Sequence, residues 1–270
     1  MSKYWVDISG GLASATCLFR TIDRYGKENV SARFADTRTE SSDTYEFIDR
    51  VIDVAGVDLV KLDQGKDIWD VFMDRKMMTQ PSRGCLASYW LKKIPLNEHA
   101  KRFPDSTFMI GFGPDECDRV ERIQTNNPTI KFDFPLRWEP KGWYCDVKRE
   151  LNEAGITQFP IAYREGMGHN NCNRRCIQGG IGYWSLKWKD YPNEYAIDEK
   201  KEQEFLQMLR DEGRNEHTIL KDRRGGKPKN FSLKQLRIEL ENGIRFPDEQ
   251  QRIKCACDMA QQLVMFDEMK

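Results

Sequence analysis

The sequence predicts an α/β fold: a parallel sheet with helices on both faces, followed by a helical C-terminal region. Short apolar runs alternate with amphipathic segments along the first 65 residues, and a Ser-Gly-Gly turn follows the first apolar run. After residue 198 the pattern changes to charged helical segments. Strands separated by helices favour βαβ units, in which neighbouring strands run parallel. The expected fold is therefore a Rossmann-like sheet of about five or more strands.

The individual elements follow from apolar patterning and turn residues. In the segment 42–55, Tyr45, Ile48 and Ile52 share one helical face, and Gly56 is a typical helix stop. The apolar run YWVDI, which ends at a Ser-Gly-Gly turn, is typical of a buried strand. The expected strands are residues 4–8, 30–35, 57–62 and 107–112, and the expected helices are residues 13–25, 42–55, 116–123 and 143–154.

Composition limits the classes of protein that the chain can belong to. The 43 basic and 43 acidic residues give no net charge, which argues against a general nucleic-acid binder. The basic stretch 221–229 (KDRRGGKPK) is expected to be a solvated linker. No apolar run approaches the roughly 18 residues of a membrane span, and the first apolar run is too short for a signal peptide. We therefore expect a cytoplasmic protein with no membrane partner.

A glycine-rich turn between the first strand and the first helix predicts a phosphate-binding loop. Glycines allow the tight turn and bring backbone N–H groups against phosphate oxygens, and the N-terminus of the helix adds partial positive charge. The alternative is a Gly-Gly turn that only starts a helix. The carboxyl edge of such a sheet is where ligands bind, which favours the phosphate loop. The candidate binding residues are Ser9, Gly10, Gly11, Leu12, Ala13 and Ser14.

This loop, SGGLAS, resembles the SGGxDS loop of the PP-loop superfamily, which contains the ATP pyrophosphatases and the sulfonucleotide reductases. Further segments resemble phosphoadenylyl-sulfate reductases in the same order, so that the resemblance extends over residues 5–190. Where the superfamily usually has aspartate, this chain has Ala13. Ala13 therefore lacks the carboxylate that would help to arrange magnesium or the leaving pyrophosphate. The similar segments are residues 34–51, 84–96, 111–119, 134–138 and 166–176.

The resemblance implies roles for four residues outside the loop. Among candidate cations, which also include Lys92 and Arg122, it favours Lys93 and Arg119 as catalytic counter-charges. It places Asp36 and Thr37 beside the adenosine part of the nucleotide, although Asp36 could instead cap the next turn. The implied ligand is ATP with Mg²⁺. On this basis we expect a nucleotide-binding domain at residues 1–197 and a helical appendage at residues 198–270.

Cys172 and Cys176 in HNNCNRRC predict metal binding together with His169, and the resemblance implies that Cys85 lies on the same side of the fold. The chain has eight cysteines, and in a cytoplasmic protein metal binding, catalysis or burial is more common than disulfide formation. Thiolates suit zinc or an iron–sulfur cluster. The resemblance points to a [4Fe-4S] cluster held by three cysteines, while His169 could instead complete a zinc site. Buried thiols without a metal are the third possibility. The candidate ligands are Cys85, His169, Cys172 and Cys176.

Three functions remain open at this point. The first is an ATP-dependent enzyme that adenylates an acceptor, releases pyrophosphate, and permits sulfur or nitrogen insertion. The second is a sulfonucleotide reductase, although the C-terminal Glu-Cys-Gly segment of those enzymes has no match here. The third, motivated by Ala13, is a nucleotide-binding protein without catalysis. The acceptor could be tRNA, DNA, a small molecule or a protein thiol, and the resemblance also implies a homodimer.

Overall fold

The computed structural model describes residues 3–80, 84–138, 146–163 and 171–246. Its centre is a five-stranded sheet with the strand order β3-β2-β1-β6-β7, in which all neighbouring strands are parallel. The predicted α/β fold with a parallel sheet is therefore confirmed. The strands are β1 (Tyr4–Ile8), β2 (Val30–Asp36), β3 (Leu59–Asp63), β6 (Thr107–Met109) and β7 (Lys131–Asp133).

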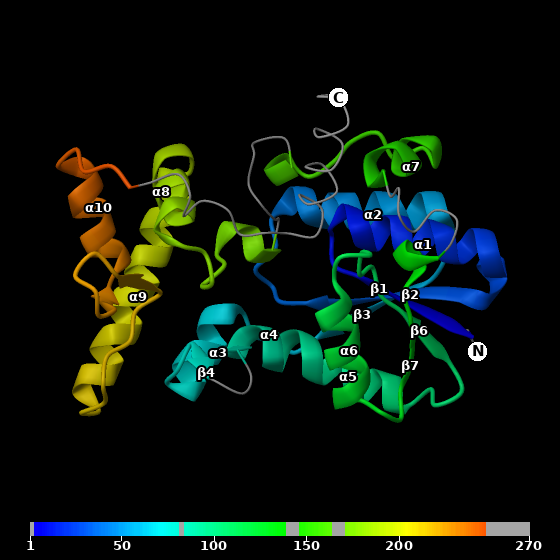
Figure 1. Cartoon of the computed structure of the whole chain (residues 1–270), viewed down its shortest axis with the longest axis horizontal. Helices are drawn as coiled ribbons and strands as arrows, with labels where there is room; N and C mark the ends of the chain where they lie inside the picture. Colours follow the sequence, from blue (N-terminus) through cyan, green and yellow to red (C-terminus); the bar gives the residue numbers. More distant parts are fainter. Residues whose placement is uncertain (1–2, 81–83, 139–145, 164–170, 247–270) are drawn as a thin grey trace.

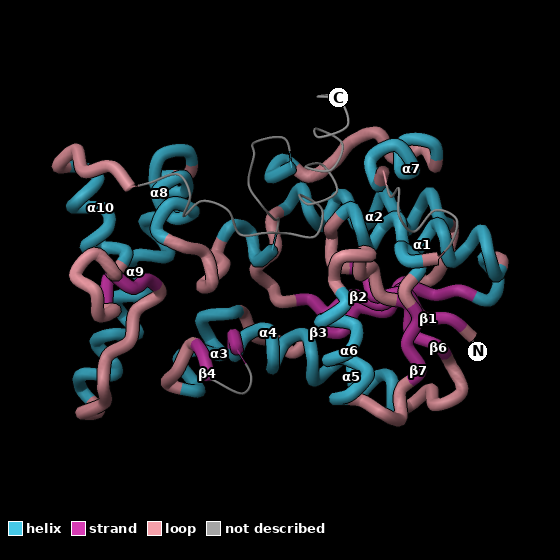
Figure 2. The backbone as a smooth tube through the Cα atoms, in the orientation of Figure 1, coloured by secondary structure: helices cyan, strands magenta, loops and turns pink. Residues whose placement is uncertain are grey.

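Helices cover both faces of this sheet, as Figures 1 and 2 show. Side chains alternate between the faces of a strand. Val6 accordingly packs in the cluster that contains residues of α1 and α2, while Trp5 packs with Ala100 of α5 and Phe108 on the other side. The helices are α1 (Leu12–Tyr25), α2 (Ser42–Ala55) and α7 (Val147–Glu153) on one face, and α5 (Ile94–Lys101) and α6 (Cys117–Asn126) on the other.

The predicted boundaries agree closely at the start of the chain. The first strand and the second helix have the predicted limits, and Gly56 ends that helix in the left-handed conformation, with φ 63°. The strand predicted at 107–112 is shorter, because only Thr107–Met109 pair with β1. Of the helix predicted at 143–154, residues 143–145 lie outside the described ranges. Its described part begins after Asp146, which accepts a hydrogen bond from the Arg149 amide at 3.0 Å.

A second group of elements stands between the sheet and the C-terminal helices. Apolar residues of α3 and α4 share one buried cluster with α9. This region also contains a single π-helical turn, η2, which leads directly into α5. The elements are α3 (Ile68–Arg75), β4 (Thr79–Gln80), β5 (Gly84–Cys85), α4 (Leu86–Ser88) and η2 (Tyr89–Lys93), with 3₁₀ turns η1 (Lys27–Asn29), η3 (Pro135–Arg137), η5 (Ile161–Tyr163) and η6 (Asn171–Arg174) elsewhere.

The C-terminal region is helical as predicted, with a small hairpin added. The stretch 221–229 is almost entirely exposed, as expected, but it belongs to this hairpin and its turn and is not a linker. Leu220 and Phe231 are buried and anchor the two strands in the helical core. The predicted division between residues 197 and 198 lies inside α9. The elements are α8 (Ile181–Asp190), α9 (Pro192–Asp211), β8 (Leu220–Asp222), β9 (Lys229–Phe231) and α10 (Leu233–Glu241).

None of the helices within the described ranges combines the length and the apolar composition that a membrane-spanning segment needs.

Candidate functional site

The strand order places a topological switch point between β1 and β6. From β1 the chain moves outward to β2 and β3, and it later returns to the other side of β1 through β6 and β7. The helices that follow β1 and β6 consequently cover opposite faces, and α/β sheets bind ligands beyond the carboxyl ends of the strands at such a point. The predicted phosphate loop follows β1 directly. It therefore lies where α/β sheets bind ligands.

Hydrogen bonds within the loop hold it in a compact turn. Ser14 Oγ accepts hydrogen bonds from the Ser9 amide (3.1 Å) and the Ser9 hydroxyl (3.2 Å), and donates to the Gly11 carbonyl (2.8 Å). Helix α1 begins at Leu12 with Gly11 as its N-cap, so no cap side chain competes for the first amides of the helix. Free amides at a helix N-terminus bind anions. Ala13, on the first turn, is half-buried.

Two close approaches require glycine around this loop. Gly10 has φ 75°, and a Cβ there would lie only 2.3 Å from Thr44 Cγ2 of α2. A Cβ on Gly111, just after β6, would lie 2.8 Å from the Ala13 carbonyl oxygen. Any side chain at either position would displace the loop or its neighbour. The loop is therefore fitted between α2 and the end of β6.

Asp36 ends β2 at the same edge and Thr37 follows it, and protein groups bind both side chains. Asp36 accepts hydrogen bonds from the Arg38 amide (2.8 Å) and the Tyr45 hydroxyl (2.7 Å), and pairs with Lys61 (2.9 Å). Burial raises the pKa of this carboxyl, but these hydrogen bonds together lower it below the ordinary value. The bond to Arg38 is the turn-capping role expected as the alternative. Thr37 is buried, and its hydroxyl donates a hydrogen bond to Glu40 at 3.2 Å.

The predicted cations differ in their surroundings. Lys93 is exposed, and within the described ranges no hydrogen bond or ion pair involves its side chain. Lys92, one residue earlier in the π-helical turn, is half-buried and pairs with Glu40 at 3.2 Å. Arg119 pairs with Glu116 and lies over the Phe112 ring, 4.2 Å from its centroid. Lys92 is therefore the lysine that the fold directs toward the loop after β2.

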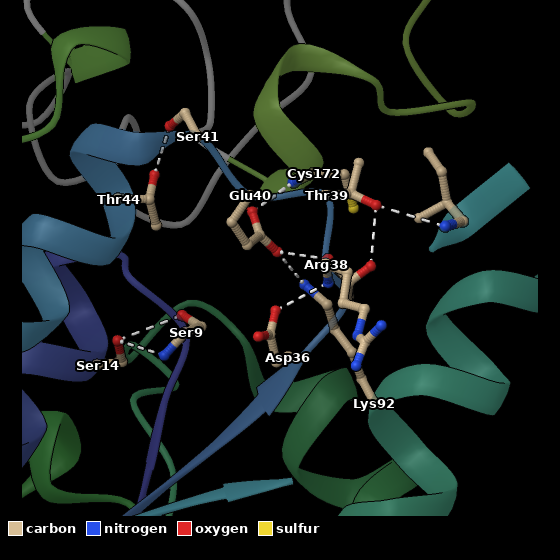
Figure 3. A network of polar contacts seen from close by, with 12 residues as sticks. Ser9, Ser14, Asp36, Arg38, Thr39, Glu40, Ser41, Thr44, Lys92 and Cys172 are labelled. Carbon is tan, nitrogen blue, oxygen red and sulfur yellow. Dashed lines mark hydrogen bonds and ion pairs between the residues drawn. The ribbon is translucent and has the colours of Figure 1, made fainter. Parts of the chain in front are cut away.

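Sequence reasoning missed two residues of this region. Glu40 is buried, with 1% of its side chain exposed, and its carboxylate joins three segments of the chain (Figure 3). Tyr163 places its hydroxyl 3.1 Å from the position that a Cβ on Gly11 would occupy. An acidic residue in a loop that follows a buried strand was the available signal for Glu40. Tyr163 had no comparable signal, because only tertiary packing brings it to the loop.

Three of the predicted metal ligands lie in one neighbourhood around Lys92. Burial lowers the pKa of the Lys92 ammonium group, but the nearby Glu40, Cys172 and Cys85 raise it more, so the pKa lies above its ordinary value. Burial raises the pKa of the Cys85, Cys172 and Cys176 thiols, so each favours its protonated form. The fourth predicted ligand, His169, lies outside the described residues.

The described residues alone do not supply a complete metal site. Across residues 3–80, 84–138, 146–163 and 171–246, no three His, Cys, Asp or Glu side chains are grouped so that they could hold a metal ion. The turn that carries Cys172 is unusual in another respect. Cys172, Asn173 and Arg174 are consecutive non-glycine residues with φ of 54°, 47° and 59°. Such strained conformations persist only where surrounding contacts impose them, and they cluster at functional sites.

Comparisons with known proteins complete the description of the site. No family model matches the chain, and no curated protein matches it. Among solved structures, the chain is similar to a crystal structure of phosphoadenylyl-sulfate (PAPS) reductase from Candida auris in a phosphate complex, with 15% sequence identity and a TM-score of 0.46. The similarity covers 63% of this chain and 81% of that chain. The α/β class itself follows from the strand order and the helices on both faces of the sheet.

Proposed function

We propose that this chain is a PP-loop enzyme that binds ATP at the carboxyl edge of its sheet and adenylates an acceptor. The observation that carries the proposal is the loop at residues 9–14. It lies at the topological switch point, begins α1 without a capping side chain, and is fitted against Gly111 without room for a Cβ. These properties suit a phosphate chain that is bound by backbone amides.

In the proposed reaction an acceptor atom attacks the α-phosphorus of ATP. The bond from the α-phosphorus to the bridging oxygen breaks, and pyrophosphate leaves with the electron pair. Negative charge develops on the leaving group, so nearby cations and helix amides accelerate the step. Arg119 and Lys93 are the proposed cations, and Asp36 and Thr37 are proposed to border the adenosine. Mg²⁺ would enter with ATP as part of the substrate.

Two other functions stay in competition with adenylation. A sulfonucleotide reductase would use the same phosphate loop with a sulfonucleotide, and the order of the segments that resemble phosphoadenylyl-sulfate reductases favours it. A nucleotide-binding protein without catalysis would explain Ala13 in place of the usual aspartate. Adenylation is preferred because of the cysteines: Cys85, Cys172 and Cys176 all lie near Lys92, and thiols suit sulfur chemistry on an activated acceptor.

The deciding experiment measures pyrophosphate and sulfite with the same purified protein. ATP is offered with tRNA, DNA or small-metabolite fractions, and PAPS is offered with a thiol donor. Acceptor-dependent pyrophosphate release supports adenylation, while sulfite release supports reduction. Tight ATP binding without either product favours the non-catalytic alternative. Ala13→Asp then shows whether the remaining site can turn over once the carboxylate is present.

The cysteine set is tested separately from nucleotide chemistry. We propose that Cys85, Cys172 and Cys176 bind a [4Fe-4S] cluster or, together with His169, zinc. Protein purified without oxygen is analysed for iron, sulfide and zinc, and Cys172→Ala serves as the comparison. Metal that is stoichiometric in the unaltered chain and lost in the variant supports the site. Metal-free protein contradicts it without affecting the nucleotide proposal.

A further inference from the structure

Glu40 belongs to the loop that follows β2, and its carboxylate lies where this loop meets the π-helical turn η2 and the turn at residues 172–174, here called the cysteine turn (Figure 3). Its Oε1 accepts hydrogen bonds from the Thr37 hydroxyl and from the Lys92 ammonium, both at 3.2 Å. Its Oε2 accepts a hydrogen bond from the Cys172 amide at 2.9 Å. One buried side chain therefore connects three segments that are far apart in the sequence.

These bonds are expected to be strong and geometrically selective. The carboxylate is 1% exposed, so water does not compete for its lone pairs. Hydrogen bonds to an ionised acceptor are stronger than those between neutral groups, and a buried charge needs all of its partners. A neutral amide of the same size could not accept at both oxygen positions. The chain thus has a specific need for glutamate at position 40.

The cysteine turn is held from two sides. On the sheet side, the Cys172 amide donates to Glu40. On the helical side, the Arg174 carbonyl accepts a hydrogen bond from Lys187 Nζ at 3.2 Å, and the Arg174 guanidinium pairs with Glu194 at 3.0 Å. The left-handed conformation of this turn is unfavourable for non-glycine residues, so it depends on these contacts. Loss of Glu40 removes the contact on the side of the nucleotide site.

We propose that Glu40 is a positioning residue that couples nucleotide binding to the cysteine turn. The inference rests on the proposed function in one respect, because the proposed function places Thr37 beside the adenosine of ATP. When a ligand draws the Thr37 hydroxyl away from Oε1, the hydrogen bonds that Glu40 accepts from the Lys92 ammonium and from the Cys172 amide change. The cysteine turn then responds to the occupancy of the phosphate loop, and by linkage the loop responds to the turn.

Hydrogen exchange at the Cys172 amide tests this coupling directly, since that N–H is itself the group bound by Glu40. In the unaltered chain we expect ATP to change the exchange rate of this amide. In Glu40→Gln and Glu40→Ala without nucleotide, we expect exchange about tenfold faster or more, as the loss of a hydrogen bond to a charged acceptor implies. In both variants the response to ATP should disappear.

Glu202→Gln is the matched control. Glu202 is also buried and accepts hydrogen bonds from two backbone amides, those of Ile219 (2.9 Å) and Leu233 (2.6 Å), but it lies in the helical region. We expect its replacement to leave the exchange of the Cys172 amide and its response to ATP as in the unaltered chain. An equal effect of this variant would reduce Glu40 to a general contributor to stability and overturn the proposal.

Direct ATP binding, measured by calorimetry on each variant, separates the two proposals. If the unaltered chain binds ATP and the Cys172 amide does not respond, the coupling is overturned while the proposed function stands. This comparison needs no substitution, so it holds even if the Glu40 variants fail to fold. If the unaltered chain does not bind ATP, the proposed function and the coupling both fail.

Discussion

Buried acidic residues occur in two regions of this molecule, and their partners differ in kind. At the carboxyl edge of the sheet, Glu40 binds one hydroxyl, one lysine and one amide, all from loops or a turn. In the helical region, Asp198 of α9 binds Lys187 Nζ at 2.6 Å, Arg175 Nε at 3.1 Å and Trp69 Nε1 at 3.2 Å. Two of these partners, Lys187 and Trp69, lie on helices packed against α9.

The kind of partner separates the roles of the two carboxylates. Asp198 connects packed helices in the helical region, so its removal should mainly lower the overall stability of the protein. Glu40 connects loops and a turn at the carboxyl edge of the sheet, so its removal should change the proposed nucleotide site more than the overall stability. Burial alone therefore does not distinguish a structural carboxylate from a positioning one. What distinguishes them is whether the partners come from packed helices or from loops and turns.

The helical side of this comparison should respond most strongly to substitution. Asp198→Ala leaves Lys187, with a fully buried ammonium group, without its main counter-charge. We expect the free energy of unfolding to fall by about 3–5 kcal/mol, as in other broken buried ion pairs. Urea denaturation followed by fluorescence measures it. Lys187→Met should cost less, because Asp198 keeps Arg175 and Trp69; an equal or larger loss in that variant would contradict the assignment.

The next effect in size is a pH dependence that comes from Glu202. Burial raises the pKa of this carboxyl to about 7 from an ordinary value of 4.5. Since the folded pKa lies above the unfolded one, the stabilising contribution is complete below pH 4.5 and is lost as the pH rises through about 7. The expected loss is about 3 kcal/mol. Denaturation between pH 4 and pH 8 measures it, and Glu202→Gln should remove this part of the slope.

The third effect concerns the proposed nucleotide site alone. Gly10→Ala introduces a Cβ that would lie 2.3 Å from Thr44 at φ 75°, so the loop must shift. We expect ATP affinity to fall about tenfold or more. Gly56→Ala is the control, because Gly56 also has positive φ but no atom lies within 4 Å of a Cβ placed there. If both variants bind ATP equally well, the loop does not hold the phosphates.

An exposed ion-pair network provides the weakest effect and tests the contrast between buried and exposed charges. Arg224 pairs with Asp222 at 2.9 Å and with Glu239 at 2.7 Å, but 48% of its side chain is exposed, unlike that of Asp198. Water screens such pairs, so we expect Arg224→Ala to cost less than about 1 kcal/mol in urea denaturation. A loss as large as that of Asp198→Ala would remove the distinction drawn between buried and exposed networks.

The sequence predicted much of the sheet region, and the reasons are local. Tyr4–Ile8 and Ser42–Ala55 have the predicted limits, since apolar runs, helical periodicity and a stop such as Gly56 depend on neighbouring residues only. The position of SGGLAS after the first strand also followed from the order of the elements. The hairpin at 220–231 was missed, because its strands are only three residues long and are held by buried Leu220 and Phe231.

Short-range pattern in the chain was enough to determine the α/β class, the parallel order of βαβ units and the place of the glycine loop. Tertiary packing alone brings Lys92, rather than Lys93, to Glu40, and lets Glu40 reach Cys172 across 132 positions of the chain. These contacts depend on how a π-helical turn, a loop and a strained turn pack together. Such packing leaves no periodic pattern in the sequence, so these contacts could not be predicted from the sequence alone.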